Sequence, residues 1–294
     1  MRGAVNPDHS PIEPGPARCG NCKSPLAGPW CSQCGQHAHE SARGIGALLH
    51  DAWHSLTHLD GRVGQTLRLL LLQPGALTAE YFANRRARFA PPFRLYLICS
   101  LVFFALASIT TPATTPEQPV LVVGDAKDTA TSCAAVQWNG QPPPAWLLHA
   151  CQRIASDNGA GLGHAFLANA PKMMFVLLPL VALVMLPFWW RPRRWYVEHL
   201  VFSLHTHTFV FATFSLLVVL NAVGERWLSL DSLTQWLSVP LWVWMLAYPW
   251  LAMRRYYGQS RWRTTLKFMA LACLYGCLLT AAVAGNVVLS ALTL

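Results

Sequence analysis

Five long apolar stretches, joined by loops that alternate between arginine-rich and nearly arginine-free, limit what this chain can fold into. Each stretch is close to the roughly 20 residues that an α-helix needs to cross a bilayer. A helix also satisfies its backbone polar groups internally, which the hydrocarbon core demands. The sequence therefore predicts an all-α integral membrane helical bundle whose transmembrane helices occupy residues 93–111, 173–190, 199–222, 233–253 and 266–289.

Composition supports a membrane protein and argues against a nucleic-acid binder. Hydrophobic residues make up 53% of the chain and charged residues only 12%, which is too apolar for an ordinary soluble domain. The net charge of +9 comes from basic residues that mostly flank the apolar stretches. Membrane topology and anionic headgroups explain this distribution, so we expect the lipid bilayer, and no nucleic acid, as a partner.

The arginine distribution predicts how the bundle is oriented. Loops rich in arginine face the cytoplasm in multi-pass proteins of the bacterial inner membrane. Such loops precede the first apolar stretch and join the second to the third and the fourth to the fifth. The N-terminus is then cytoplasmic and the C-terminus extracytoplasmic, and the first forty residues contain no apolar run resembling a cleavable signal. We expect contacts with lipid phosphate from Arg85, Arg86 and Arg88.

Two segments outside the helices are rich in proline. Residues 1–18 are expected to be a disordered tail, and residues 112–170 an extracytoplasmic loop that is partly helical at best. Cys133 and Cys151 lie in this loop. On an oxidising side they could form a disulfide worth up to about 3 kcal/mol in the chain-entropy model, and two free thiols are the equal alternative.

A four-cysteine cluster predicts a zinc ribbon over residues 19–36. Two C-x-x-C pairs, Cys19 with Cys22 and Cys31 with Cys34, are separated by eight residues. Four thiolates on two tight turns suit one tetrahedral Zn²⁺, and such a short segment cannot build a core without a metal. Unliganded thiols and a rubredoxin-like iron are the alternatives. A closed site of this kind lacks an open position for catalysis, so we expect a recognition or assembly element for a cytoplasmic protein partner.

Short amphipathic helices are predicted between the ribbon and the first transmembrane helix, within residues 44–92. Turn signals divide this segment into helices at 45–58, 63–72 and 76–84. In the first of them His50, His54 and His58 form one stripe that could bind a metal or respond to pH. The alternative is an amphipathic surface at the lipid headgroups.

Four ionisable residues occur where the third apolar stretch begins: Glu198, His199, His205 and His207. Such groups are costly in a membrane, so they need a reason. Glu198 and His205 share one helix face, whereas His207 points roughly opposite His205. A second metal ion or a proton site would therefore need ligands from another element, such as the stripe of three upstream histidines. The alternative is that the histidines form interhelical hydrogen bonds and Glu198 caps its helix or pairs with Arg193 or Arg194.

The motifs along the chain carry a resemblance to a known family. They are the C-x-x-C…C-x-x-C-G-Q head, H-S-L-T-H-L-D-G at 54–61, T-L-R-L-L at 66–70, Q-P-G at 73–75, R-R-A-R at 85–88, P-P-F at 91–93 and Y-V-E-H-L-V-F at 196–202. Together they resemble domain of unknown function 3667, a family of uncharacterised bacterial membrane proteins. The resemblance covers most of the chain apart from the loop and the last helices, and it implies the architecture without an activity.

Three functions follow, in decreasing order of support. The first is a membrane-anchored binding or assembly factor with a structural zinc ribbon. The second is a membrane metalloenzyme or metal-handling protein that uses the histidine and glutamate cluster, although no catalytic pattern such as H-E-x-x-H occurs. The third is a proton-coupled transporter. The sequence leaves both enzymatic activity and the oligomeric state open.

Overall fold

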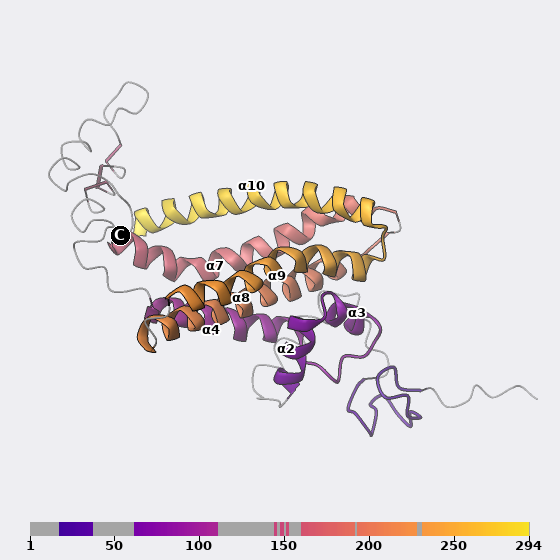
Figure 1. The fold of residues 1–294 in the computed structure, drawn as a ribbon. Helices are drawn as coiled ribbons and strands as arrows, with labels where there is room; N and C mark the ends of the chain where they lie inside the picture. Colours follow the sequence, from indigo (N-terminus) through magenta and orange to yellow (C-terminus); the bar gives the residue numbers. More distant parts are fainter. Residues whose placement is uncertain are drawn as a thin grey trace, which may run out of the picture.

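The computed structural model describes residues 18–37, 62–110, 144–145, 148–149, 151–152, 160–191, 193–227 and 231–293. Over these residues the fold is all-helical, apart from two isolated bridges in the cysteine segment (Figure 1). The helices are α2 (Arg62–Leu72), α3 (Ala76–Phe82), α4 (Pro92–Thr110), α7 (Ala160–Met185) with the 3-10 helix η1 (Leu186–Trp189), α8 (Tyr196–Trp227), α9 (Asp231–Tyr257) and α10 (Arg261–Thr293).

Within this described part, five helices are long and apolar enough to cross a membrane. These spans are Pro92–Thr110, Ala165–Trp189, Tyr196–Gly224, Trp236–Tyr257 and Arg261–Ala291. They lie side by side and run the length of the molecule, with α10 on its outer edge (Figure 1). The predicted all-α membrane bundle is confirmed, and the exposed large apolar side chains on its surface, such as Leu101 and Leu246, suit contact with lipid.

The helices extend beyond the apolar stretches from which they were predicted. The largest difference is in α7, which begins at Ala160, whereas the sequence places a loop up to residue 170. The added turns carry polar groups that form hydrogen bonds with α10. Asn169 Nδ2 donates to Ser290 Oγ at 3.3 Å, and Asn286 Nδ2 of α10 donates to the Phe166 carbonyl at 3.2 Å. Hydropathy alone misses such turns because their partners lie on another helix.

Aromatic side chains form the centre of the bundle. Phe209 of α8 stacks on Tyr248 of α9 with ring centroids 3.5 Å apart, and Trp189 stacks on Tyr257 at 4.0 Å. These four rings belong to one cluster of buried residues. Aromatic pairs of this kind contribute beyond the area that they bury, so they fix α8 and α9 against each other and against η1.

Helices α2 and α3 pack beside the bundle near the end where α8 begins (Figure 1). Gly75, in the turn between them, has φ 72°, a conformation that glycine adopts without strain. A Cβ at this position would lie 2.6 Å from the Ala252 carbonyl oxygen of α9. The indole Nε1 of Trp244 donates to the Leu71 carbonyl at 2.9 Å. The two short helices predicted over these residues are therefore present and anchored on α9, whereas the predicted helix at 45–58 lies outside the described residues.

Candidate metal centre

The cysteine segment, residues 18–37, consists of two similar turns that we call the first and second knuckle. In the first, Cys19 N donates to the Ser24 carbonyl at 2.9 Å and Lys23 N donates to the Cys19 carbonyl at 3.0 Å. The second repeats this pattern, with Cys31 N bonded to the Gln36 carbonyl at 2.9 Å and Gly35 N to the Cys31 carbonyl at 2.8 Å. Lys23 and Gly35 occupy equivalent positions and both have positive φ. Each C-x-x-C pair thus closes its own tight turn.

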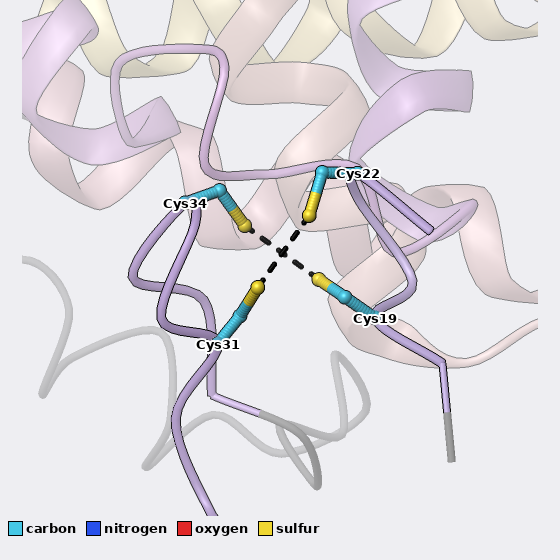
Figure 2. A group of neighbouring side chains, drawn as sticks. All are labelled: Cys19, Cys22, Cys31 and Cys34. Atoms are coloured by element: carbon cyan, nitrogen blue, oxygen red, sulfur yellow. Dashed lines mark hydrogen bonds between the residues drawn. The ribbon is translucent and has the colours of Figure 1, made fainter. Parts of the chain in front are cut away.

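The two knuckles bring all four sulfurs to one point (Figure 2). The sulfurs lie within 4.8 Å of one another, with Cys19 and Cys34 at 3.6 Å and Cys22 and Cys31 at 3.4 Å. Four sulfurs bound to Zn²⁺ at about 2.3 Å in tetrahedral geometry would be about 3.8 Å apart, so the arrangement fits a metal of this size. In the described part of the chain, no other group of three or more histidine, cysteine or acidic side chains converges in this way.

Local hydrogen bonds favour the thiolate form in the first knuckle, whereas burial raises the pKa of Cys31 in the second knuckle to about 11. The Ser24 hydroxyl and backbone lower the pKa of Cys22 to about 6. The backbone N–H of Cys22 in turn lowers the pKa of the Cys19 thiol. Because the thiolate is the form that binds metals, these bonds prepare the first knuckle as a ligand pair.

Gln36 attaches the cysteine segment to the turn between α3 and α4. Its side chain is 5% exposed, and its Nε2 donates to the Asn84 backbone carbonyl at 2.9 Å and to Asn84 Oδ1 at 2.8 Å. Its Oε1 accepts from the backbone N–H groups of Arg86 at 3.3 Å and Ala87 at 3.2 Å. Gly20 also contacts this turn, since a Cβ there would lie 2.5 Å from Asn84 Nδ2. The cysteine segment is thus docked on the entrance to the first transmembrane helix.

The arginines of this turn have partners within the protein. Arg85 pairs with Glu80, with Nη2 to Oε1 at 2.6 Å, and this bond lowers the pKa of the Glu80 carboxyl. The Arg86 guanidinium lies over the Tyr81 ring at 4.7 Å and donates to its carbonyl at 3.3 Å. Arg88 is exposed. Lipid-phosphate contacts from the three arginines stay a prediction, and the first two also hold the shape of the turn.

The surface that Gln36 contacts lies in a segment that matches a family model. Residues 60–104 match the family model for a protein of unknown function, DUF3667. The match confirms the resemblance for the motifs at 66–70, 73–75, 85–88 and 91–93, whereas the C-x-x-C head and the motif at 196–202 lie outside the matched residues. Neither the curated proteins nor the solved structures contain a match. The DUF3667 segment comprises α2, α3, the turn between α3 and α4, and most of α4.

Glu198 stabilises the start of α8 rather than facing its neighbouring histidines. Its Oε1 accepts from the backbone N–H of Trp195 at 3.1 Å, which is the reciprocal bond of a capping box. Its Oε2 accepts from Arg194 Nη1 and from the Tyr256 hydroxyl, both at 2.8 Å. Both carboxylate oxygens are therefore engaged in the way that the packing alternative predicts.

The three histidines of α8 point to three different helices. His199 Nδ1 is 2.7 Å from the Tyr257 hydroxyl of α9, and His207 Nε2 is 3.3 Å from the Tyr275 hydroxyl of α10. His205 Nδ1 is 2.8 Å from Thr78 Oγ1 and thus bonds α8 to the DUF3667 segment. These histidines and Glu198 do not converge on one point. A site completed by His50, His54 and His58 stays a prediction, because those three residues lie outside the described part.

Of the two cysteines of the predicted disulfide, only Cys151 is among the described residues. Cys151 is disulfide-bonded. Cys133 lies outside the described residues, so the pairing of these two cysteines stays a prediction.

Gln36 and Asn84 are the docking residues that the sequence analysis did not single out. The only sequence signal was the C-G-Q ending of the second C-x-x-C pair. A glutamine directly after a C-x-x-C-G sequence is inconspicuous because its partner is 48 positions away along the chain.

Proposed function

We propose that this protein is a membrane-anchored binding or assembly factor whose cysteine segment holds a structural Zn²⁺. One observation carries the proposal: four thiols converge on one point, and the segment that holds them is clamped by Gln36 to the entrance of the membrane domain. Four thiolates fill a tetrahedral shell, which stabilises a fold and leaves no position for a substrate. The zinc would therefore supply structure, and the docked segment would supply a surface.

The loop between the two knuckles supports the binding role. It is uncharged from Pro25 to Trp30, its residues are largely exposed, and Trp30 itself is 62% exposed. The Trp30 ring contacts His37 edge-on at 4.7 Å, so it is held in place while its outer face is free for a partner. A rigid, exposed tryptophan is a typical anchor of protein interfaces. The arginine-rich connections support a position of this surface on the cytoplasmic side of a bacterial inner membrane.

Metal content tests the structural part of the proposal. We expect about one zinc per chain in detergent-purified protein, as a closed four-thiolate site requires. The double variant Cys22→Ser, Cys34→Ser should lose the metal, and a chain starting at Arg43 should hold none. Metal retained by either variant would shift support to the metalloenzyme alternative, because the ligands would then lie elsewhere in the chain.

Site-specific photocrosslinking in native membranes tests the binding part. A photoreactive residue at Trp30 should give a discrete crosslinked product with one cytoplasmic protein, and the product should disappear in the Cys22→Ser, Cys34→Ser variant. The same residue at Gln65, an exposed position of α2, is the matched control. Equal products from both positions, or a product that survives loss of the metal, would contradict a partner surface on the zinc segment.

A further inference from the structure

Two cavities follow one another along the seam between α7 and α10. The first, of about 280 Å³, lies among α7, α8, α9 and α10, and the second, of about 370 Å³, lies between α7 and α10. Leu278 of α10 contributes to the walls of both. The α7 residues that line them run from Asn169 to Met185, a distance of about 24 Å at the helical rise per residue. The seam is thus a long, narrow site within the membrane part of the protein.

The inner cavity offers apolar walls to whatever fills it. Its polar side chains have partners within the protein: His207 Nδ1 is 2.8 Å from the Ser203 backbone carbonyl oxygen and 3.3 Å from Ser203 Oγ, and His207 Nε2 is 3.3 Å from the Tyr275 hydroxyl. The remaining lining is aliphatic and aromatic, for example Val181 and Leu271. An occupant with polar groups at this depth would find few partners, whereas a hydrocarbon chain would lose nothing. A bilayer supplies such chains in the form of acyl tails.

A basic side chain, Lys172, lies at the other end of the seam. Lys172 is exposed and lines the outer cavity. Its Nζ donates to Asn169 Oδ1 at 3.0 Å, which uses one of its three donors. Asn169 is held in turn by the buried Ser290 at 3.3 Å. A positive charge fixed at the mouth of an apolar seam is complementary to a lipid whose headgroup is an anion.

We propose that the seam between α7 and α10 binds one anionic phospholipid, with an acyl chain in the two cavities and the phosphate at Lys172. The start of α7 and the end of α10, which form the Lys172 end of the seam, lie at the end of the bundle away from the cysteine segment (Figure 1). The other cavity extends toward the end where α8 begins, and both cavities are lined by residues of the long helices rather than by the cysteine segment. The bound lipid fills space between α7 and α10 that protein side chains leave open.

Two glycines of α10 provide a matched test. A Cβ at Gly285, which lines the outer cavity, or at Gly276, which lines neither cavity, would meet no atom within 4 Å. Gly285→Leu therefore places a side chain in the seam, and Gly276→Leu places the same side chain elsewhere on the helix. The full-length protein is reconstituted in vesicles of phosphatidylcholine and phosphatidylglycerol, the latter with a photoreactive group at the end of one acyl chain.

Irradiation of the wild type should label peptides that contain 181–185 and 271–278, which line the inner cavity. Gly285→Leu should lose most of this labelling and Gly276→Leu should keep it. Lys172→Met should lower the preference for phosphatidylglycerol over phosphatidylcholine about fivefold, the effect of one lysine near a charged headgroup. Equal labelling in the two glycine variants, or wild-type labels spread evenly over the lipid-facing helices, would overturn the proposal in favour of ordinary annular lipid. The wild-type labelling map and the lipid preference of Lys172→Met do not depend on Gly285→Leu. These two measurements therefore still test the proposal if Gly285→Leu fails to fold.

Discussion

Replacing Gln36 by alanine should release the cysteine segment from the membrane domain without removing its metal. The amide of Gln36 joins the second knuckle to the backbone of Asn84, Arg86 and Ala87. None of these bonds involves a sulfur ligand. Gln36→Ala therefore separates docking from metal binding, which a cysteine substitution cannot do.

The size of the effect follows from the geometry of the four contacts. The two bonds that Gln36 donates are short, at 2.9 and 2.8 Å, whereas the two that it accepts are long, at 3.3 and 3.2 Å. The two strong bonds contribute about 0.5–1.5 kcal/mol each, and leaving buried partners unpaired costs about 1–3 kcal/mol. We therefore expect docking to weaken by about 1–3 kcal/mol, which is about 5- to 150-fold in the docking equilibrium.

Hydrogen–deuterium exchange of the detergent-purified protein measures this change. Peptides that contain the backbone amides of Arg86 and Ala87 should exchange faster in Gln36→Ala, because their acceptor is gone. Zinc content should remain at the wild-type level. The control is Gln33→Ala, since Gln33 belongs to the same knuckle but is exposed.

Two results would refute this reasoning. If residues 84–89 exchange equally in the Gln36 and Gln33 variants, the amide bonds do not hold the two parts together. If the Gln36 variant loses its zinc, docking and metal binding are one event, and the cysteine segment does not fold by itself.

Three further predictions address docking, packing and pH. Gly20→Ala should increase hydrogen–deuterium exchange at residues 84–89, because a Cβ at Gly20 would collide with Asn84. Gly28→Ala is the control, since a Cβ at Gly28 meets nothing within 4 Å. Equal exchange in the two variants would show that the first knuckle does not contact this turn. Glu198→Ala should destabilise the protein by about 1–3 kcal/mol in chemical denaturation and leave its metal content unchanged; loss of metal would instead support a second site. The pKa of Glu80 is lowered by Arg85, so its contribution to stability is present at neutral pH and is lost as pH falls through the lowered pKa. Denaturation midpoints of wild type and Glu80→Gln should therefore differ at neutral pH and converge in acid, and a constant difference would contradict the assignment.

The membrane bundle could be predicted from the sequence because its signals are local. A bilayer requires about 20 apolar residues in a helix, and such stretches are visible without any knowledge of tertiary contacts. The ends of the helices could not be predicted in this way. The first turns of α7 contain Asn169 and Lys172 and read as loop, yet they are helical where α10 provides partners such as Ser290.

The candidate site was predictable to the same extent. The spacing of the four cysteines in two C-x-x-C pairs was sufficient to expect their convergence. For the third span, helical geometry predicted that His205 and His207 point apart, and the structure places them against different elements, Thr78 of α3 and Tyr275 of α10. The sequence could not identify these partners, so a shared site and separate packing roles were equally compatible with it.

Several long-range contacts that sequence patterns do not reveal involve residues of the DUF3667 segment. On one side Asn84 receives Gln36, 48 positions away, and on the other Thr78 and Leu71 bond to side chains 127 and 173 positions away. Periodicity and spacing describe what a residue does within its own helix, and they contain no information about partners at such separations. Within the described residues, the segment contacts the cysteine knuckles as well as α8 and α9. A structural change in the cysteine segment can therefore be transmitted through it to the membrane helices. A substitution at Thr78, or at Trp244, whose indole donates to the Leu71 backbone carbonyl, should therefore affect the bundle. A substitution at Asn84 should affect docking, and only one at the cysteines should affect the metal.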